Sequence, residues 1–335
     1  MSGAYFRPLI QSGQARPHGA VSLQGGPLWF EHIECLQRDV PSKFLRVQEI
    51  PADILENLTA PQAPLCGLDS QVPKIMGILN TTPDSFSDGG QNYKFQDAIT
   101  RAKKMIAEGA DILDVGGEST RPNADFIPAQ IETRRTTPVI STLRASGITL
   151  PISIDTRKAD VARSAIANGA NMLNDVTALS YDPDSVHLAA RHRVPVVLMH
   201  AAGDPKTMQD SPEYSDVLLD VYDYLAARIE VCIAAEIPRR NIMIDPGIGF
   251  GKTVAHNLAL LRGISLFHTL GCPILLGASR KSLIGALGNA PNPADRLPGS
   301  LAIALYAMNQ GVQMLRVHDI TETKQAIRLW SALNI

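Results

Sequence analysis

From residue 73 onward, the chain alternates short apolar runs with stretches of helical spacing. The eight apolar runs are Ile75–Leu79, Ile112–Val115, Ile152–Ile154, Met172–Leu173, Val196–Met199, Ile242–Ile244, Ile274–Leu276 and Met314–Val317. A short apolar run without polar alternation is typical of a strand buried on both faces of a parallel sheet. Apolar residues between the runs recur at helical spacing, and the sequence therefore predicts helices over 95–109, 159–169, 217–235 and 301–310.

Eight strand–helix units in about 260 residues match the size of a closed (β/α)8 barrel. A doubly wound open sheet is the alternative, but the regularity of eight units favours closure. We therefore predict an α/β fold, with a (β/α)8 TIM barrel over residues 73–335. Residues 1–72 are richer in Pro and Gly and carry short apolar patches, at 27–30 and 44–47. They predict a small N-terminal extension or subdomain, a hairpin with a short helix; the alternative is a partly ordered extension without a function of its own.

Charge and cysteine content limit the possible partners and compartment. A formal net charge of −2 over 335 residues argues against a nucleic-acid binder that relies on overall basicity. Apolar stretches fall short of the roughly 20 residues that span a membrane, and the N-terminus does not resemble a secretory signal. The four cysteines are scattered without a C-x-x-C pair, which favours reduced thiols in a cytoplasmic protein. We expect small-molecule substrates, with neither nucleic acid nor a membrane as a partner.

Polar side chains follow every one of the eight apolar runs. They are Asn80, Glu118–Arg121, Asp155, Asn174–Asp175, His200, Asp245, Ser279–Lys281, and Arg316 with His318. The active site of such a barrel lies at the C-terminal ends of the strands, so these residues converge on one rim. Because clustered polar groups need partners, the rim predicts a ligand site.

The polar rim divides into two chemical groups. One supplies donors and positive charge for an anion such as phosphate or pyrophosphate, and contains Arg121, Arg280, Lys281, Arg316 and His318. The other supplies acceptors for the N–H groups of a guanidine-like heterocycle, and contains Asp155, Asn174 and Asp245.

Each of these residues also has a structural alternative. Arg121 or Arg280 would serve in a salt bridge within a loop, Asp155 would cap the helix that begins near residue 159, and His318 would be an ordinary buried histidine. The loop at 247–252 contains three glycines and a lysine, but its spacing differs from that of a phosphate-binding P-loop. We predict a mobile loop there, beside the site, with Phe250 as an aromatic wall.

Seven separate motifs resemble those of the dihydropteroate synthase family, the folate-pathway enzymes inhibited by sulfonamides. In the family's order they lie at residues 77–90, 114–122, 153–156, 173–175, 245–247, 279–282 and 316–318. The resemblance covers about residues 73–335 and leaves the N-terminal extension outside.

The resemblance implies a transferase that joins 6-hydroxymethyl-7,8-dihydropterin pyrophosphate to p-aminobenzoate, releasing pyrophosphate, with Mg²⁺ as cofactor. It implies four sets of site residues and a homodimer. The pterin set is Asp155, Asn174, Met199, Asp245 and Lys281; the pyrophosphate set is Asn80, Arg121, Arg316 and His318, with Asn80 also at the metal. The p-aminobenzoate pocket is Phe86, Thr120, Pro122, Phe250 and Ser279, together with Lys281, and the catalytic set is Lys281, Arg316, His318 and Arg121.

The rim is consistent with dissociative loss of pyrophosphate before the amine attacks. Negative charge then grows on the leaving group beside Arg316 and His318, and positive charge grows on the pterin beside Asp155 and Asp245. Preorganised charges of this kind are usually the largest catalytic contribution. The rivals are a pterin-dependent methyltransferase on the same barrel and a non-catalytic pterin-binding barrel.

Overall fold

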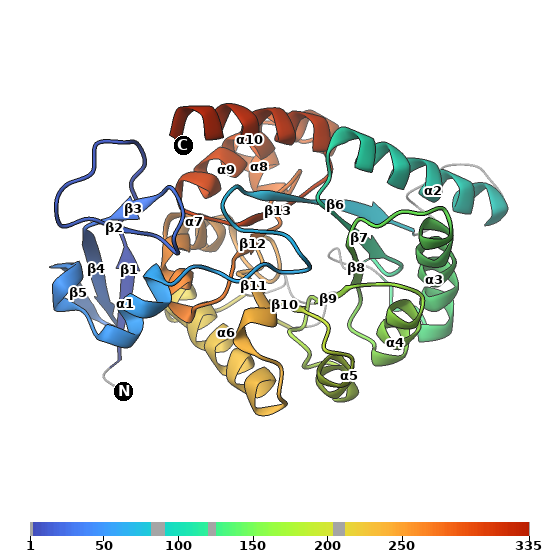
Figure 1. Ribbon diagram of the computed structural model, residues 1–335, viewed down its shortest axis with the longest axis horizontal. Coiled ribbons are helices and arrows are strands. Elements are labelled where there is room, and N and C mark those ends of the chain that lie inside the picture. Colours follow the sequence, from blue (N-terminus) through green and yellow to red (C-terminus); the bar gives the residue numbers. More distant parts are fainter. Residues whose placement is uncertain (1–2, 82–90, 120–124, 204–211, 335) are drawn as a thin grey trace.

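The computed structural model describes residues 3–81, 91–119, 125–203 and 212–334, apart from the side chains of 91–94 (Figure 1). Eight parallel strands form its central sheet: β6 (Lys74–Asn80), β7 (Ile112–Gly116), β8 (Ile152–Asp155), β9 (Met172–Asp175), β10 (Val196–Met199), β11 (Ile242–Asp245), β12 (Leu275–Leu276) and β13 (Met314–Val317). Their order is β11-β10-β9-β8-β7-β6-β13-β12.

A parallel bridge joins the two ends of this strand order. Ile244 of β11 pairs with Ile274, directly before β12. The Ile244 N–H donates to the Pro273 carbonyl across 3.0 Å. Because this bond joins the first and last strands, the sheet is closed, and the prediction of a (β/α)8 barrel is confirmed.

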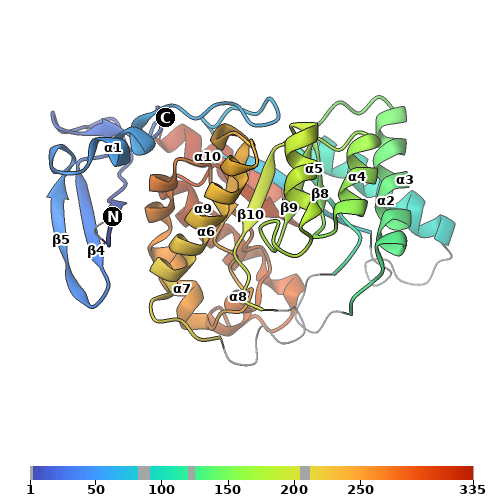
Figure 2. The ribbon, with the colours of Figure 1, turned by 90° about the horizontal axis from the view of Figure 1, so that it is seen from below.

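Helices follow the strands and surround the barrel (Figures 1 and 2). They are α2 (Gln91–Glu108), α3 (Ala129–Ala145), α4 (Ala159–Ala167), α5 (Asp184–His192), α6 (Val217–Ala234), α7 (Val254–Arg262), α8 (Ser282–Leu287), α9 (Leu297–Asn309) and α10 (Ile320–Asn334), with short 3-10 turns η3 (Arg239–Asn241), η4 (Ile264–Leu270) and η5 (Pro293–Arg296). The predicted helices agree with these except at two N-terminal ends. Helix α2 begins at Gln91 rather than 95, and α9 begins at Leu297 rather than 301, since Pro298 is tolerated in a first turn.

The inward side chains form layers because alternate residues of a strand point to opposite faces. The lower layer is apolar and contains Met76, Ile112, Met172, Val197, Met243, Leu275 and Met314, with Leu65 packed against it. Two residues further along the strands stand Asp114, Asn174, Met199, Asp245 and Arg316. One end of the barrel interior is therefore filled by aliphatic and methionine side chains, and the other end is lined by polar groups.

Residues before the barrel form a small β-rich unit beside it (Figures 1 and 2). A three-stranded antiparallel sheet has the order β1 (Ala4–Pro8), β4 (His32–Gln37), β5 (Val40–Arg46), and β2 (Val21–Ser22) pairs with β3 (Trp29–Phe30). A 3-10 turn η1 (Val47–Glu49) and helix α1 (Ala52–Thr59) follow. Phe30, Ile33 and Leu58 of this unit are fully buried in the same apolar cluster as the outer layer of the barrel.

Two further expectations concern the cysteines and the membrane. All four cysteines are free thiols, and Cys232 and Cys272 are buried. Within the described ranges, the helices are too short or too polar to cross a membrane.

Candidate active site

Four strand ends stand side by side at the polar rim. Asn80, Gly116, Asp155 and Asn174 are consecutive cross-strand neighbours on β6, β7, β8 and β9. A Cβ on Gly116 would lie 3.5 Å from Asp155 Oδ2 and 3.7 Å from Asn80 Oδ1. The glycine therefore leaves room of about the size of a methyl group between Asn80, the predicted metal residue, and Asp155, a predicted pterin residue.

Arg316 joins the two groups of the rim that the sequence suggested were separate. Its Nε donates to Asp114 Oδ2 across 2.6 Å, and its Nη2 donates to Asp155 Oδ2 across 2.7 Å. Asn174 Nδ2 also donates to Asp114 Oδ2, at 3.1 Å. The predicted pyrophosphate residue Arg316 thus holds a predicted pterin residue, Asp155, in place.

Two carboxylate oxygens in this network remain available. Asp114 Oδ1 and Asp155 Oδ1 are buried and have no hydrogen-bond partner. Burial raises the pKa of Asp155 to about 8, against the opposing effect of Arg316. Buried acceptors without partners are costly, so this pair is suited to a ligand that brings N–H donors.

Asp175, next to Asn174, has a structural role instead. Its Oδ1 accepts from the Thr177 N–H and hydroxyl, both at 2.7 Å, and its Oδ2 accepts from the Leu179 N–H at 3.2 Å. Burial raises the pKa of Asp175 to about 6. This carboxylate shapes the turn after β9 and does not face a ligand.

Asp245 and Lys281 influence each other electrostatically at the β11 side of the rim. The Gly247 N–H donates to Asp245 Oδ1 across 2.7 Å, and burial raises the pKa of this carboxyl. The Lys281 ammonium contacts the Ile248 carbonyl and lies 4.2 Å from the centre of the Phe250 ring. Burial lowers the pKa of Lys281 to about 7, while Asp245 opposes the shift. An aromatic ring and the Lys281 side chain therefore lie against each other here, and their roles in the p-aminobenzoate pocket stay a prediction.

Lys252 fastens the loop that carries Phe250. Its Nζ lies 2.9 Å from the carbonyls of Gly247 and Phe250 and 2.9 Å from His200 Nδ1. Lys252 is buried, as is His200, whose pKa is lowered to about 3 by burial and by Lys252. His200 therefore supports the loop as a neutral ring.

His318 follows β13 and is hydrogen-bonded to Ser279 after β12. His318 Nδ1 lies 3.1 Å from Ser279 Oγ, which also accepts from the His318 N–H at 3.3 Å. Burial, reinforced by Arg316 and Arg280, lowers the pKa of His318 to about 3. At neutral pH the ring of His318 is therefore uncharged in the ligand-free protein, and it would offer an anion a ring nitrogen instead of a positive charge.

Arg280 also differs from the sequence expectation. Its guanidinium forms a two-point ion pair with Asp319. Nε donates to Oδ2 across 2.9 Å, and Nη2 donates to Oδ1. The salt-bridge alternative is the one observed, and the anion group of the rim loses one of its members.

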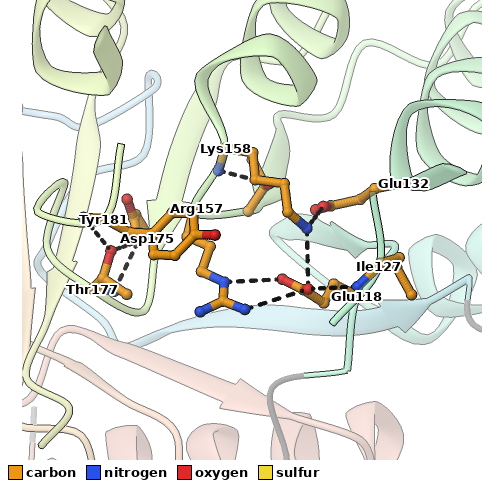
Figure 3. A network of polar contacts seen from close by, with 9 residues as sticks. Glu118, Ile127, Glu132, Arg157, Lys158, Asp175, Thr177 and Tyr181 are labelled. Carbon is orange, nitrogen blue, oxygen red and sulfur yellow. Dashed lines mark hydrogen bonds and ion pairs between the residues drawn. The ribbon is translucent and has the colours of Figure 1, made fainter. Parts of the chain in front are cut away.

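Glu118 belongs to a buried network formed by residues that follow β7 and β8 (Figure 3). Its carboxylate accepts from Arg157 Nε at 3.2 Å, from Lys158 Nζ at 3.0 Å and from the Ile127 N–H at 3.3 Å. Lys158 also pairs with Glu132 at 2.7 Å. Both oxygens of Glu118 are engaged by these partners, which gives Glu118 a structural role, whereas Glu132 Oε1 is buried without a hydrogen-bond partner.

Of the remaining predicted site residues, the structure describes Met199 but not the four on the two loops after β6 and β7. Met199 ends β10 with 5% of its surface exposed, and its Cγ would lie 3.3 Å from a Cβ on Gly247. Phe86, Thr120, Arg121 and Pro122 lie outside the described residues.

Sequence reasoning missed Asp114 and Lys252. Asp114 interrupts an apolar run at an inward position, and this charge inside a buried strand is the signal that identifies it. Lys252 carries no comparable signal, because a lysine after a glycine-rich loop is usually exposed.

The comparisons with known proteins bear on this arrangement directly. A family model described as pterin binding enzyme matches residues 76–318. The dihydropteroate synthase of Escherichia coli K12 is 46% identical over 265 residues, covering 79% of this chain and 93% of that protein. The chain belongs to the dihydropteroate synthases.

Other members of the dihydropteroate synthases agree in sequence and in fold. The enzyme of Neisseria meningitidis serogroup B is 47% identical over 275 residues, covering 80% of this chain and 95% of that protein. The Xanthomonas albilineans synthase, solved with 4-aminobenzoic acid, has a TM-score of 0.76 at 44% identity over 82% of this chain and 98% of that one. A second structure of that synthase, in complex with 7,8-dihydropteroate, has a TM-score of 0.72 at 43% identity, covering 79% of this chain and 95% of that one.

Proposed function

We propose that this chain condenses 6-hydroxymethyl-7,8-dihydropterin pyrophosphate with p-aminobenzoate, giving 7,8-dihydropteroate and pyrophosphate. The observation that carries the assignment is the unpartnered Oδ1 of Asp155, buried beside Asn174 at the polar rim. A pterin brings the amino and ring N–H donors that such an acceptor lacks. The family membership then favours the synthase over the methyltransferase and non-catalytic rivals.

The pterin subsite is built from Asp155, Asn174, Asp245 and Met199, with Lys281 at its edge. Asp155 and Asp245 accept from the pterin and stabilise the positive charge that grows on it as the C–O bond to pyrophosphate breaks. Met199 packs near the ring. Because Asp155 is held in advance by Arg316 and Asp245 by the Gly247 N–H, little reorganisation accompanies the charge separation.

The leaving group is received on the opposite side of the pterin. Arg316 supplies charge there and His318 supplies a neutral N–H, and Arg121 adds a second guanidinium. Asn80 is the proposed ligand of Mg²⁺, an ion that binds few protein oxygens and completes its shell with water and substrate phosphates. Its side-chain oxygen next to the space above Gly116 fits that chemistry. Bound Mg²⁺ supplies positive charge against the departing pyrophosphate.

The amine attacks from the side of Lys281 and Phe250. Phe250 is the proposed wall for the p-aminobenzoate ring, and Ser279 and Lys281 complete the described part of this pocket; Phe86, Thr120 and Pro122 are its further proposed members. A ring stacked on Phe250 places its carboxylate within reach of a cation.

We also propose that the protein is a homodimer. Helices α9 and α10 pack together and expose Leu305, Leu329 and Leu333, the last with 82% of its surface accessible. Exposed leucines grouped on two adjacent helices favour burial against a second copy. Light scattering after size exclusion tests this, with Leu329→Glu and Leu333→Glu expected to give monomers. The cytoplasmic location remains a prediction, supported by the free thiols.

The experiment for the reaction is pyrophosphate release by the purified protein. Release should require the pterin pyrophosphate, p-aminobenzoate and Mg²⁺ together, with dihydropteroate formed in equal amount. Pterin binding without release would identify a non-catalytic barrel, and failure to bind a pterin would overturn the reading of Asp155.

A further inference from the structure

The tip of the hairpin formed by β4 and β5 is attached to helix α6 of the barrel. Arg38, between the two strands, donates from Nη1 to Asp220 Oδ1 across 2.6 Å and from Nη2 to Asp223 Oδ2 across 2.8 Å. The Tyr5 hydroxyl of β1 also donates to Asp223, at 2.9 Å. Figure 2 shows this hairpin standing beside the barrel. A side chain of the N-terminal extension thus reaches the first turn of a barrel helix.

Asp220 uses its second oxygen on the segment that leads into α6. Asp220 Oδ2 accepts from the N–H groups of Ser215 and Asp216, at 3.0 and 3.2 Å. Asp216 in turn caps the helix by accepting from the Leu218 and Leu219 N–H groups. One carboxylate therefore ties the extension to the backbone directly before the helix.

The residue before Ser215 is bonded to the loop that carries Phe250. The Tyr214 hydroxyl donates to the Gly251 carbonyl across 2.8 Å. Its ring meets His256 of α7 edge-on, with ring centres 5.0 Å apart. Gly251 has a positive φ of 61° and would place a Cβ 2.7 Å from Ala202, so its backbone has little room to move.

The far end of this series of contacts lies at the proposed p-aminobenzoate pocket, called the amine subsite below. The loop from Gly247 to Gly251 places Phe250 beside the Lys281 ammonium. Lys252 binds the Phe250 carbonyl from below. Because Gly251 directly follows Phe250, we expect a displacement of Gly251 to change the separation of Phe250 and Lys281.

We infer that Arg38 is a positioning residue for the amine subsite. Through Asp220 and Tyr214 the N-terminal extension holds the Gly247–Gly251 loop at the distance from Lys281 that the aromatic substrate requires. This inference rests on the proposed function for the identity of that substrate, while the mechanical link rests on the contacts alone. The extension lies outside the residues matched by the family model, which begin at 76.

The test compares steady-state kinetics of the full chain with those of Arg38→Met and Tyr214→Phe. Each variant should raise the KM for p-aminobenzoate roughly two- to fivefold, the range expected for a partly exposed ion pair or one hydrogen bond. The KM for the pterin pyrophosphate should be unchanged, because the contacts of Asp155 are not touched. Arg38→Lys should restore most of the loss.

Non-additivity makes the test specific to this link. Both substitutions break the same series of contacts, so the double variant should be no worse than Tyr214→Phe alone. Additive effects, or an equal rise in both KM values, would overturn the inference.

Glu230→Gln is the matched control. It removes an ion pair with Arg239 at 3.0 Å, also partly exposed, near the other end of α6. It should leave both KM values unchanged, whatever its effect on melting temperature.

Hydrogen exchange separates this inference from the proposed function. Amides of residues 247–252 should exchange faster in Arg38→Met than in the unsubstituted chain or Glu230→Gln, whether or not the protein is active. If the amides exchange faster in Arg38→Met but the unsubstituted chain does not catalyse the reaction, the proposed reaction is refuted and the link between Arg38 and the loop stands. Unchanged exchange in an active enzyme would refute the link and keep the reaction.

Discussion

Arg316 and Asp155 are hydrogen-bonded across the mouth of the barrel, with Nη2 donating to Oδ2 at 2.7 Å. They come from β13 and β8, which are not neighbours in the sheet. The proposed leaving-group side and the proposed pterin side therefore share one ion pair. As the C–O bond breaks, Arg316 would stabilise the negative charge that grows on the leaving group, and Asp155 would stabilise the positive charge that grows on the pterin. The two partners of one pair thus act on both charges at the same moment.

We expect pterin affinity to rise with pH up to about 8. Burial raises the pKa of Asp155 to about 8, so the free enzyme carries a proton there at lower pH. The pterin binds the carboxylate form, and binding below this pKa must release that proton, at a cost of about tenfold in affinity per pH unit. Calorimetry with a pterin between pH 6 and 9 measures this. Asp155→Asn should bind more weakly and show a flat profile; an equally steep profile in this variant would assign the proton elsewhere.

Arg316→Met should destabilise the fold as well as stop turnover. The substitution leaves Asp114 and Asp155 as buried carboxylates without their cation, and loss of one partner of such a pair costs about 3 kcal/mol. Urea unfolding measures the difference. The loss should shrink as the pH falls below about 8, where Asp155 takes up a proton, and should fall further in the double variant with Asp114→Asn. A stability equal to that of the unsubstituted chain at pH 8 would contradict the network.

His318 should act as a neutral donor. Its pKa, lowered to about 3, keeps it uncharged at neutral pH. His318→Gln, which keeps an N–H donor, should retain much more turnover than His318→Leu, which should lose about 10²–10³ in kcat. Equal losses in the two variants would indicate that turnover depends on the imidazole ring and its hydrogen bond with Ser279, not on an N–H donor alone.

Gly247→Ala should disrupt the loop that carries Phe250. A Cβ at this position would lie 1.9 Å from the His200 carbonyl oxygen, and the residue has a positive φ of 68°. We expect loss of the p-aminobenzoate reaction with a clear drop in melting temperature. Gly147→Ala is the matched control, because it has a positive φ of 79° but open space around it. Wild-type kinetics in Gly247→Ala would show that the loop is free to rearrange.

The barrel could be predicted from the sequence because its strands are buried on both faces and its polar residues collect where they end. The predicted rim positions from Asn80 to His318 that the structure describes do lie at strand ends. Their partners could not be predicted, because ion pairing depends on which residues meet across the barrel. Arg280 turns to Asp319 and Glu118 turns to Arg157, although both look like ligand-binding groups in the linear sequence.

The extension was the least predictable part. Its apolar patches indicated something to bury, but the surface that receives them depends on the folded positions of α6 and η4. Ser265 of η4 donates to the Pro8 carbonyl across 2.9 Å, a contact between residues far apart in the chain.

The apolar end of the barrel contains four thioethers, in Met76, Met172, Met243 and Met314, none more than 2% exposed. Peroxide converts methionine into a polar sulfoxide, which such a layer has no means of solvating. Oxidation of these four sulfurs therefore requires the barrel to open. A methionine sulfoxide in this layer would then oppose closing, because the polar group would have to be buried again. In cells under oxidative stress, the rate at which the barrel opens would then set the working lifetime of the enzyme.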